Sequence, residues 1–481
     1  MIKDFKYLPK DKRKKILLIC DDIRVHSGIA TVGKEIVVHT AQHFNWAQIA
    51  GAIEHPDQGK LIDLSDSINK DVGLNDSYCK LYPTNGYGNI ELVRQIIKIE
   101  NPDALMIITD PRYFDWLFRA EAEIRKSMPL IYLNIWDDYP APLYNKAFYE
   151  SCDLLMGISK QTVNINKIVL GDKANDKIVK YLPHGLNHKV YRPLETTEEL
   201  NKLEEVKSEI FGKDEVDFCL FFNSRNIRRK QIPDAMWAFK MFLDNLPKEK
   251  ADKCRFLIKS EISHEAGTDL EAVRELLFEE KYPNAVRFLQ HKFSTQDLNI
   301  LYNISDCQIL LTSNEGWGLT LTEAMLAGNP IIANVTGGMQ DQMRFEDENG
   351  EWFIPSPEIP SNHTGRYKKH GEWAFPVYPT SRSLQGSPVT PYIWDDRCQP
   401  EDAADRIREV YDLGREKRKE IGAKAREWCI SNEAGFTAEH QGKRFIEAAD
   451  ELFNTWEPRV AFEVIDTDED IRKVQTHNLV Y

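Results

Sequence analysis

Short apolar runs alternate with amphipathic stretches along most of the chain. In the first third, these runs cover residues 15–20, 104–109 and 130–135. The same rhythm resumes later, at residues 218–222, 255–259, 286–289, 307–311 and 330–333. Short, continuously apolar strands separated by helices are typical of a parallel sheet with helices on both faces. The pattern therefore predicts an α/β protein made of two Rossmann-like, doubly wound domains.

The charged segment 195–215 separates the two sets of strands, and we place the domain boundary within it. We expect a first domain at 1–205, a second domain at 206–430, and a long amphipathic helix with a tail at 431–481. Residues 344–400 interrupt the second domain with a segment rich in Pro, Gly, Ser and aromatic residues. The aromatic content predicts an ordered insertion near the cleft between the domains.

Composition and charge narrow the function classes. The 481 residues include 62 Lys and Arg against 76 Asp and Glu, a net charge of −14. This balance disfavours a protein that coats polyanions through net charge alone. The eight cysteines are scattered without a CxxC pair, which argues against a zinc site or a disulfide framework, and no metal site is predicted. The N-terminus lacks an apolar signal core and no run is long enough to span a membrane, so we expect a cytoplasmic protein.

The most informative segment follows the apolar run 307–311. It places Glu315 in a glycine-containing turn and Glu323 on the first turn of a helix that begins near Thr320 and stops at Gly328. Free N–H groups at a helix start bind anions, and ligands of doubly wound sheets bind at this end of the strands. A simpler interpretation is that Thr320 and Glu323 form a capping box that only closes the helix end. The residues alone leave both interpretations open.

The surroundings of the two glutamates resemble a known family signature. Seven residues separate Glu315 from Glu323, with Gly-Trp-Gly-Leu after the first and Ala-Met-Leu-Ala-Gly-Asn-Pro after the second. This segment resembles the E-x7-E signature of retaining glycosyltransferases of the GT-B fold, family 4. Weaker matches follow in the family's order, at Gly28, Gly157-Ile-Ser159, Pro183-His-Gly185, Arg225, Lys230, Gly337-Gly338 and residues 432–436.

The resemblance covers roughly residues 15–345 and 400–456 and implies a complete architecture. Two Rossmann-like domains would face each other across a cleft, and the C-terminal helix would cross back to the first domain. The first domain would bind the acceptor, and the second would bind a nucleotide-diphosphate sugar, expected to be a UDP-sugar. No cofactor is implied.

The family roles then fall on particular residues. Arg225, Lys230 and Glu315 are the predicted catalytic groups. The two cations would hold the donor diphosphate, where charge develops as the glycosidic bond breaks. Glu315 would contact the donor sugar, and Glu323 would accept hydrogen bonds from the ribose. Retention fits a front-face mechanism, so no nucleophile is assigned, and fixed cations would replace a metal ion.

Other donor-binding positions carry weaker signals. Gly28 matches a glycine of the family's phosphate-approach loop, where the lack of a Cβ lets the backbone come close. Gly318, Leu319 and Thr320 mark the helix start whose N–H groups would meet the phosphates. His291 lies where the family places the nucleotide base, although an exposed rim residue is the simpler interpretation.

One departure concerns the acceptor side. Many relatives have a His-Asp pair after the strand predicted at 130–135, whereas this chain has Trp136, Asp137 and Asp138. Trp136 stands at the histidine position, so the usual polar contact to the sugar is in doubt. Asp137 or Asp138 is expected to face the acceptor, and capping of the following turn is an equal alternative.

The acceptor itself is not predicted by these motifs. A hydroxyl of a glycan, lipid or small molecule is the general expectation. The insertion 344–400 resembles that of phage-type enzymes that glycosylate hydroxymethylated pyrimidines in DNA, which makes modified DNA an alternative partner in a bacterial or phage-infected cell. Another GT-B enzyme, such as a sugar-nucleotide epimerase, and an inactive nucleotide-sugar-binding protein complete the alternatives. The sequence does not predict the oligomeric state.

Overall fold

The computed structural model describes residues 7–459, and the first of its sheets has eight strands. These are β1 (Lys14–Asp21), β2 (Phe44–Ala52), β3 (Ile62–Asp63), β4 (Cys79–Asn85), β5 (Ala104–Ile108), β6 (Leu130–Asn134), β7 (Leu154–Gly157) and β8 (Ile178–Tyr181). Their order is β3-β4-β2-β1-β5-β6-β7-β8, and every neighbouring pair is parallel except β3 and β4. The residues inside β1 are fully buried, as continuous apolar runs in a covered sheet require.

Helices connect these strands. They are α1 (Gly28–Thr40), α2 (Ser65–Val72), α3 (Ile90–Glu100), α4 (Asp115–Phe118), α5 (Glu121–Ile124), α6 (Lys146–Ser151) and α7 (Lys160–Leu170). Short 3-10 helices cover Lys10–Lys12, Pro111–Phe114, Leu143–Asn145 and Gly171–Asp176. Serine caps begin the two helices nearest the cleft: Ser27 accepts from the Ala30 N–H, and Ser159 accepts from the Thr162 N–H. Ser159 follows the end of β7 by two residues, and a short loop separates Ser27 from the end of β1.

The second sheet has six parallel strands in the order β11-β10-β9-β12-β13-β14. They are β9 (Phe218–Asn223), β10 (Cys254–Lys259), β11 (Val286–Leu289), β12 (Cys307–Leu310), β13 (Ile331–Asn334) and β14 (Ala374–Val377). The segment 344–400 therefore supplies an edge strand of this sheet. It also forms an antiparallel hairpin of β15 (Ser381–Ser387) and β16 (Thr390–Arg397).

The helices of this second half are α8 (Thr197–Phe211), α9 (Ile232–Asp244), α10 (Lys248–Ala251), α11 (Leu270–Phe278), α12 (Thr295–Ile304), α13 (Leu319–Leu326), α14 (Met339–Met343), α15 (Pro400–Asp412) and α16 (Gly414–Ile430). A single 3-10 turn, Arg228–Lys230, follows β9. A capping box starts α8, because the side chains of Thr196 and Glu199 each bond the other residue's backbone.

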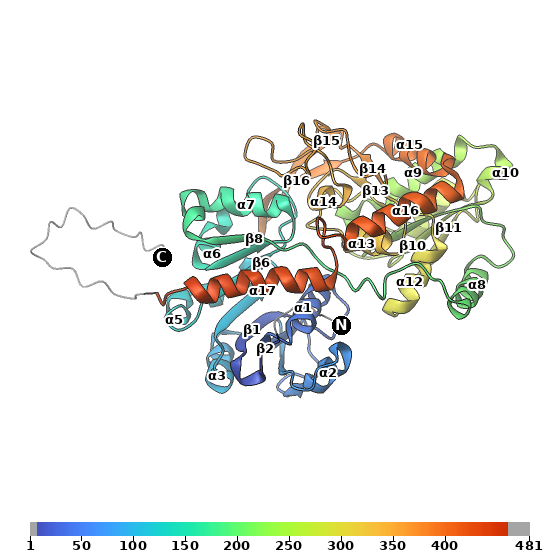
Figure 1. Ribbon diagram of the computed structural model, residues 1–481. Coiled ribbons are helices and arrows are strands. Elements are labelled where there is room, and N and C mark those ends of the chain that lie inside the picture. Colours follow the sequence, from blue (N-terminus) through green and yellow to red (C-terminus); the bar gives the residue numbers. More distant parts are fainter. Residues whose placement is uncertain (1–6, 460–481) are drawn as a thin grey trace, which may run out of the picture.

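The last helix, α17 (Ala438–Thr455), crosses from the second half back to the first, where it lies along α1 (Figure 1). Phe445 contacts the rings of Phe44 and Trp46, with centroids 5.8 and 5.7 Å away. Gly442 lets the helix backbones approach, since a Cβ there would lie 2.8 Å from the His39 carbonyl oxygen. Buried side chains of both halves join in one continuous core cluster.

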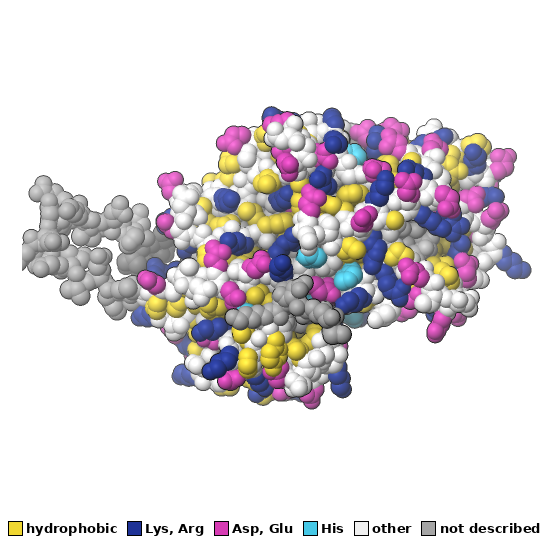
Figure 2. Space-filling view, in the orientation of Figure 1, with side chains coloured by type: hydrophobic (Ala, Val, Ile, Leu, Met, Phe, Trp, Pro, Cys, Tyr) yellow, Lys and Arg dark blue, Asp and Glu magenta, His cyan; other side chains and the backbone are white. Residues whose placement is uncertain are grey.

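This architecture confirms the predicted fold class: two doubly wound α/β units with a C-terminal helix that returns to the first. Acidic and basic side chains are mixed over the face shown in Figure 2, so no single-sign patch dominates it. Within residues 7–459, none of the helices is both long and apolar enough to cross a membrane.

The docking of α17 on α1 can be tested at its closest approach. Gly442→Val would push a branched side chain against the backbone of His39, and overpacking of this kind costs about 1–3 kcal/mol. We expect that loss in the free energy of unfolding measured by urea denaturation. Lys443→Val is the matched control, because it places the same residue on the exposed side of α17. Equal stability of the two variants would contradict close docking at Gly442.

Candidate active site

The two halves meet at the ends of their strands. The loop between β12 and α13, which carries Glu315, packs directly on the first half. A Cβ on Gly316 would lie 2.7 Å from the Ile135 carbonyl oxygen, and one on Gly337 would lie 2.9 Å from that of Asp137. No side chain fits at such distances. The glycines therefore allow the loop after β6 to touch the loops after β12 and β13.

A partly buried cluster of opposite charges surrounds Glu315. Its carboxylate accepts a hydrogen bond from Arg229 Nη1 at 2.9 Å and another from the Lys230 ammonium. Burial disfavours the ionised form, but the charges of Lys230 and Arg229 outweigh it and lower the pKa of Glu315 to about 2. Glu315 is therefore a carboxylate at any physiological pH.

Arg229 is the cation beside Glu315 that was not predicted from the sequence. Besides Glu315, its Nη1 donates to the Asn314 carbonyl oxygen at 2.7 Å, and its Nη2 lies 3.8 Å from Asp137 Oδ2 across the cleft. Arg225, which was expected here, is exposed, and among the described residues it forms no ion pair with Glu315. The only sequence signal for Arg229 was its place in the run Arg228-Arg229-Lys230.

Glu323 is held by two tyrosines. Tyr302 Oη donates to one carboxylate oxygen at 2.5 Å, and Tyr191 Oη donates to the other at 3.1 Å. Burial raises the pKa of Glu323, while both hydroxyls oppose that shift. The capping-box alternative is wrong: the N-cap of α13 is Gly318, in the left-handed region at φ 87°, and no side chain caps the helix. Glu323 therefore bonds the two tyrosines and does not close the helix end.

The start of α13 faces the first half. The N–H groups of Leu319 and Thr320, the first two residues of α13, precede the helical hydrogen-bond ladder, which begins with the bond from the Leu321 N–H to the Gly318 carbonyl oxygen, and they form an anion-binding end. Gly28, at the start of α1, lies opposite: a Cβ there would lie 3.5 Å from Leu319 Cδ1. The predicted positions Gly28, Gly318, Leu319 and Thr320 are therefore brought together across the cleft.

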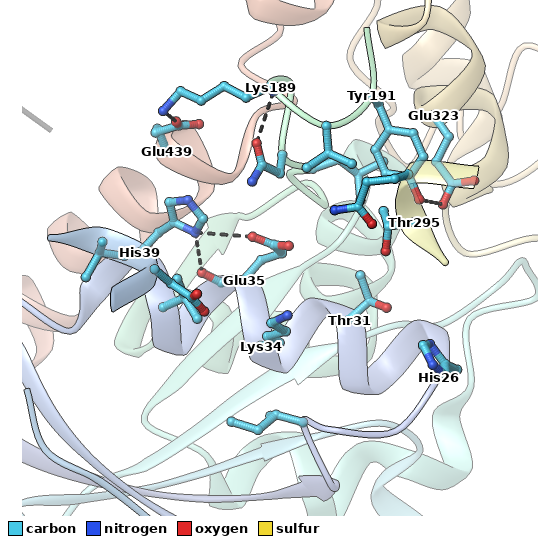
Figure 3. A pocket seen from close by; sticks show the side chains of 18 of the residues that line it. His26, Thr31, Lys34, Glu35, His39, Lys189, Tyr191, Thr295, Glu323 and Glu439 are labelled. Carbon is cyan, nitrogen blue, oxygen red and sulfur yellow. Dashed lines mark hydrogen bonds and ion pairs between the residues drawn. The ribbon is translucent and has the colours of Figure 1, made fainter. Parts of the chain in front are cut away.

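A pocket of about 510 Å³ opens beside this contact (Figure 3). Thr31, Lys34 and Glu35 of α1 line one wall, and Tyr191, Thr295 and Glu323 face them from the other side. His291 is exposed and is not among the lining residues. The pocket places the Glu323 carboxylate within reach of a molecule that occupies the cleft.

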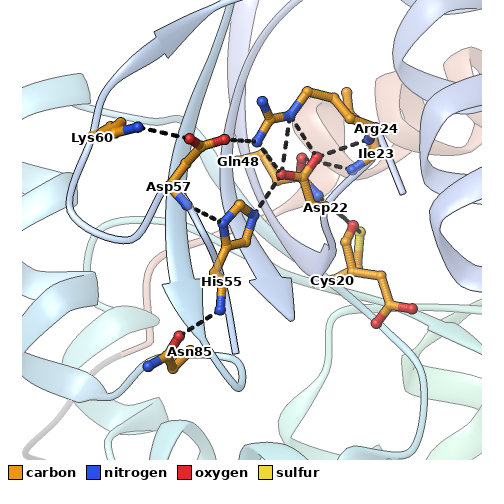
Figure 4. A network of polar contacts seen from close by, with 10 residues as sticks. Cys20, Asp22, Ile23, Arg24, Gln48, His55, Asp57, Lys60 and Asn85 are labelled. Atoms are coloured by element: carbon orange, nitrogen blue, oxygen red, sulfur yellow. Dashed lines mark hydrogen bonds and ion pairs between the residues drawn. The ribbon is translucent and has the colours of Figure 1, made fainter. Parts of the chain in front are cut away.

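A network of polar contacts braces the loop that leads into α1 (Figure 4). Asp22 is fully buried and accepts hydrogen bonds from Arg24 Nη2 at 2.6 Å and from His55 Nε2 at 2.8 Å. The Asp57 N–H donates to His55 Nδ1 at 3.0 Å, which leaves the proton of a neutral imidazole on Nε2. Burial opposes ionisation of Asp22, but Arg24 and His55 lower its pKa. Sequence reasoning treated Asp22 only as a strand end.

The three residues expected on the acceptor side separate in the structure. Trp136 is buried, and its Nε1 donates to the Asp138 carbonyl oxygen at 2.7 Å. Asp138 is also buried and accepts from Gln161 Nε2 at 2.8 Å, away from Glu315. Only Asp137 lies in the charge cluster, facing Arg229 and the Gly316 N–H. Burial raises the pKa of Asp137, while the Arg229 charge opposes this shift.

The β15–β16 hairpin belongs to the insertion 344–400 and supports the site through hydrogen bonds. Asp395 Oδ1 accepts from Asn314 Nδ2 at 2.7 Å and from Ser313 Oγ at 3.1 Å, immediately before Glu315. On its other side the hairpin touches the first half, where the Trp394 N–H donates to the Tyr139 carbonyl oxygen at 2.7 Å. The hairpin therefore binds both halves next to the cleft.

Beneath the hairpin, two carboxyl groups share one hydroxyl. Thr336 Oγ1 lies 3.3 Å from Asp138 Oδ2 and 3.0 Å from Asp396 Oδ2, and Arg382 Nη2 donates to Asp396 at 2.7 Å. Burial, with the nearby charge of Asp396, raises the pKa of Asp138 well above its ordinary range, against the opposing charge of Arg382. Asp138 is therefore a structural acid whose protonation matters for stability.

Replacing Asp138 should change how stability depends on pH. A carboxyl group whose pKa is raised by folding costs stability as pH rises from its unfolded value, about 3.9, through its folded value. We expect the free energy of unfolding of Asp138→Asn to fall less than that of wild type between about pH 5 and about pH 8. Asp402→Asn, at an exposed position, should keep the wild-type pH dependence. Urea unfolding at both pH values makes the measurement, and parallel curves for Asp138→Asn and wild type would contradict the assignment.

Comparisons with protein families and solved structures show which known proteins this chain is similar to. Residues 204–359 match the family model described as glycosyl transferases group 1. The fold is similar to a glycosyltransferase from Rickettsia africae, with TM-score 0.60, 18% identity and coverage of 92% of this chain and 100% of that one. A search of curated proteins found no match.

Two further structures share the fold over similar lengths. HepE from Anabaena, in complex with UDP and glucose, gives TM-score 0.61 at 13% identity, covering 92% of this chain and 100% of its own. Sucrose-phosphate synthase from Thermosynechococcus elongatus gives TM-score 0.63 at 14% identity, with the same coverage. These likenesses bear out the GT-B fold that the sequence motifs implied.

Proposed function

We propose that the protein is a retaining glycosyltransferase that moves a sugar from a nucleotide-diphosphate sugar, a UDP-sugar, to a hydroxyl group of an acceptor. The observation that carries the proposal is the partly buried Glu315 carboxylate, held between Lys230 and Arg229 beside the start of α13. A fixed carboxylate, fixed cations and free N–H groups together suit a donor with a polar sugar and an anionic leaving group.

The leaving diphosphate explains the cations. As the glycosidic bond breaks, negative charge collects on a phosphate oxygen, and preorganised positive groups lower the barrier. Lys230 and the first turn of α13 supply such groups in the cleft, and Arg225 lies on the same loop as Lys230. This arrangement supports a mechanism without a metal ion, in which protein cations take the role that a divalent ion plays elsewhere.

The two glutamates would then have different tasks. The pocket beside Glu323 suits the nucleoside, and each Glu323 oxygen keeps a lone pair for a ribose hydroxyl beyond its bond to tyrosine. Glu315 is engaged by two cations, which makes it a poor nucleophile and a good electrostatic partner for the donor sugar. These separate roles of Glu315 and Glu323 support a front-face reaction with retention.

The choice of uridine rests on similar folds. HepE is described in complex with UDP and glucose, and the E. coli trehalose-6-phosphate protein is described with UDP-2-fluoro glucose. Both share the fold and low sequence identity with this chain. A UDP-sugar is therefore the first donor to test here.

For the acceptor we propose only a hydroxyl group on a glycan, lipid or small molecule. The segment 366–370, which mixes cations with an aromatic residue, gives no specific support for a nucleic acid. Lys369 pairs with Glu346, and Lys368 lies over the Tyr378 ring at 4.3 Å. Neither modified DNA nor the epimerase alternative is favoured by any contact in the described residues.

Donor binding is the direct test of the proposed function. We expect one member of a panel of UDP-, GDP-, ADP- and dTDP-sugars to raise the melting temperature, since a ligand at about 100 times its Kd stabilises by about 2.7 kcal/mol. Differential scanning fluorimetry makes the measurement, and UDP-glucose is the first probe. If no nucleotide sugar in the panel raises the melting temperature, the proposal fails.

Two site variants test the catalytic assignment with the selected donor. Glu315→Gln and Lys230→Ala should each slow release of the nucleoside diphosphate by roughly 100-fold or more, because each removes a fixed charge from the reacting centre. Arg228→Ala is the control for the loop, since Arg228 is exposed beside Lys230, and Glu401→Gln is a control at an exposed glutamate. Wild-type rates in both site variants would show that the reaction happens elsewhere.

A further inference from the structure

Arg229 occupies a place that the proposed function does not yet use. It is the one residue of the charge cluster that contacts both carboxylates, Glu315 at 2.9 Å and Asp137 at 3.8 Å. Its guanidinium is anchored in the second half by the Asn314 carbonyl oxygen, whereas Asp137 belongs to the first half. Arg229 thus spans the contact between the halves.

The proposed function gives Lys230 a second task, which is to bind the donor diphosphate. Its ammonium now contacts Glu315, and among the described residues its side chain has no other hydrogen bond. A diphosphate that arrives at the start of α13 would draw this ammonium away, since a phosphate offers more charge than one carboxylate. Arg229 would remain on Glu315, because the fixed guanidinium fork also bonds the backbone of Asn314.

We propose that Arg229 is a positioning residue that holds the Glu315 and Asp137 carboxylates in one arrangement across the closed cleft while Lys230 moves to the donor diphosphate. This inference rests on the proposed function and adds a residue to it. Asp137 also accepts from the Gly316 N–H, so the first half is tied to the Glu315 loop by a second contact. The hairpin supports the same loop through Asp395, which bonds Asn314.

The charges around Glu315 determine what removing Arg229 should do. The groups that face Glu315 are Lys230 and Arg229 from the loop after β9, Asp137 from the loop after β6, and His184 from the segment after β8. Burial lowers the pKa of His184 to about 3, so this ring is neutral and does not replace a lost cation. Without Arg229, and with Lys230 on the diphosphate, the partly buried Glu315 would lose both charges that favour ionisation.

The test compares Arg229→Gln, Arg229→Lys and the control Arg228→Gln, with the donor selected by the wild-type protein, or UDP-glucose first. In Arg229→Gln we expect an unchanged KM and a fall in kcat for diphosphate release of roughly 10- to 100-fold. The acid limb of its pH–rate profile should move to higher pH, because the pKa of Glu315 rises. Arg229→Lys should keep the wild-type acid limb, since its charge remains, and recover part of kcat. Arg228→Gln should match wild type.

The possible results distinguish a failure of the positioning role of Arg229 from a failure of the proposed function. If wild type binds and turns over a donor but Arg229→Gln keeps its kcat and pH profile, the positioning role is overturned. A higher KM with unchanged kcat would also overturn it, because it would place Arg229 on the donor itself. If Arg229→Gln does not fold, Arg229→Lys provides the test. A wild-type kcat in Arg229→Lys would show that the guanidinium geometry is unimportant, and it would overturn the inference. A reduced kcat with an unchanged acid limb of the pH–rate profile would support it. Failure of wild type to bind any donor refutes the proposed function instead.

Discussion

The structure of the cleft depends on one partly buried ionic contact, between Glu315 and the pair of cations Lys230 and Arg229. Removing these charges from water costs free energy. Their mutual attraction offsets this desolvation energy only if the partners lie in good geometry and their remaining hydrogen-bond donors are satisfied. The guanidinium of Arg229 meets this condition through Asn314, and Asp137 completes the charge balance from the opposite half. Glu315, Lys230 and Arg229 all belong to the second half, so only the Asp137 contact requires the two halves to touch.

The backbone of the cleft is shaped to permit that contact. Glycines at 316 and 337 leave no room for a side chain where the loops of the two halves meet, and Gly28 approaches the start of α13. On the far side of the cleft, the hairpin holds Ser313 and Asn314 through Asp395. The net charge of −14 therefore describes the surface as a whole, while the cleft concentrates cations and helix N–H groups for an anionic ligand.

Comparing prediction with structure shows which signals in the sequence were strong. Continuous apolar runs identified strands of both sheets, because a strand covered on both faces must be apolar throughout. The partly polar β2 and β4 were not predicted. Glu323 was ambiguous from sequence, since a capping box and a ligand-binding carboxylate have the same spacing. The structure excludes the capping box, because the N-cap of α13 is Gly318, with a left-handed backbone conformation, and no side chain caps the helix.

By itself, the sequence determined the fold class, the position of the glutamate loop and the presence of cations on the loop after β9, because hydrophobic period and local turn chemistry act over short stretches of chain. Which two of the three adjacent cations contact Glu315 was decided only by the tertiary structure. The same holds for the bracing of Asp22 by His55, the burial of Trp136 and Asp138, and the hairpin that bridges both halves. Each of these depends on distances between segments far apart in the chain, and the cost of burying a charge depends on the partners that those distances bring together.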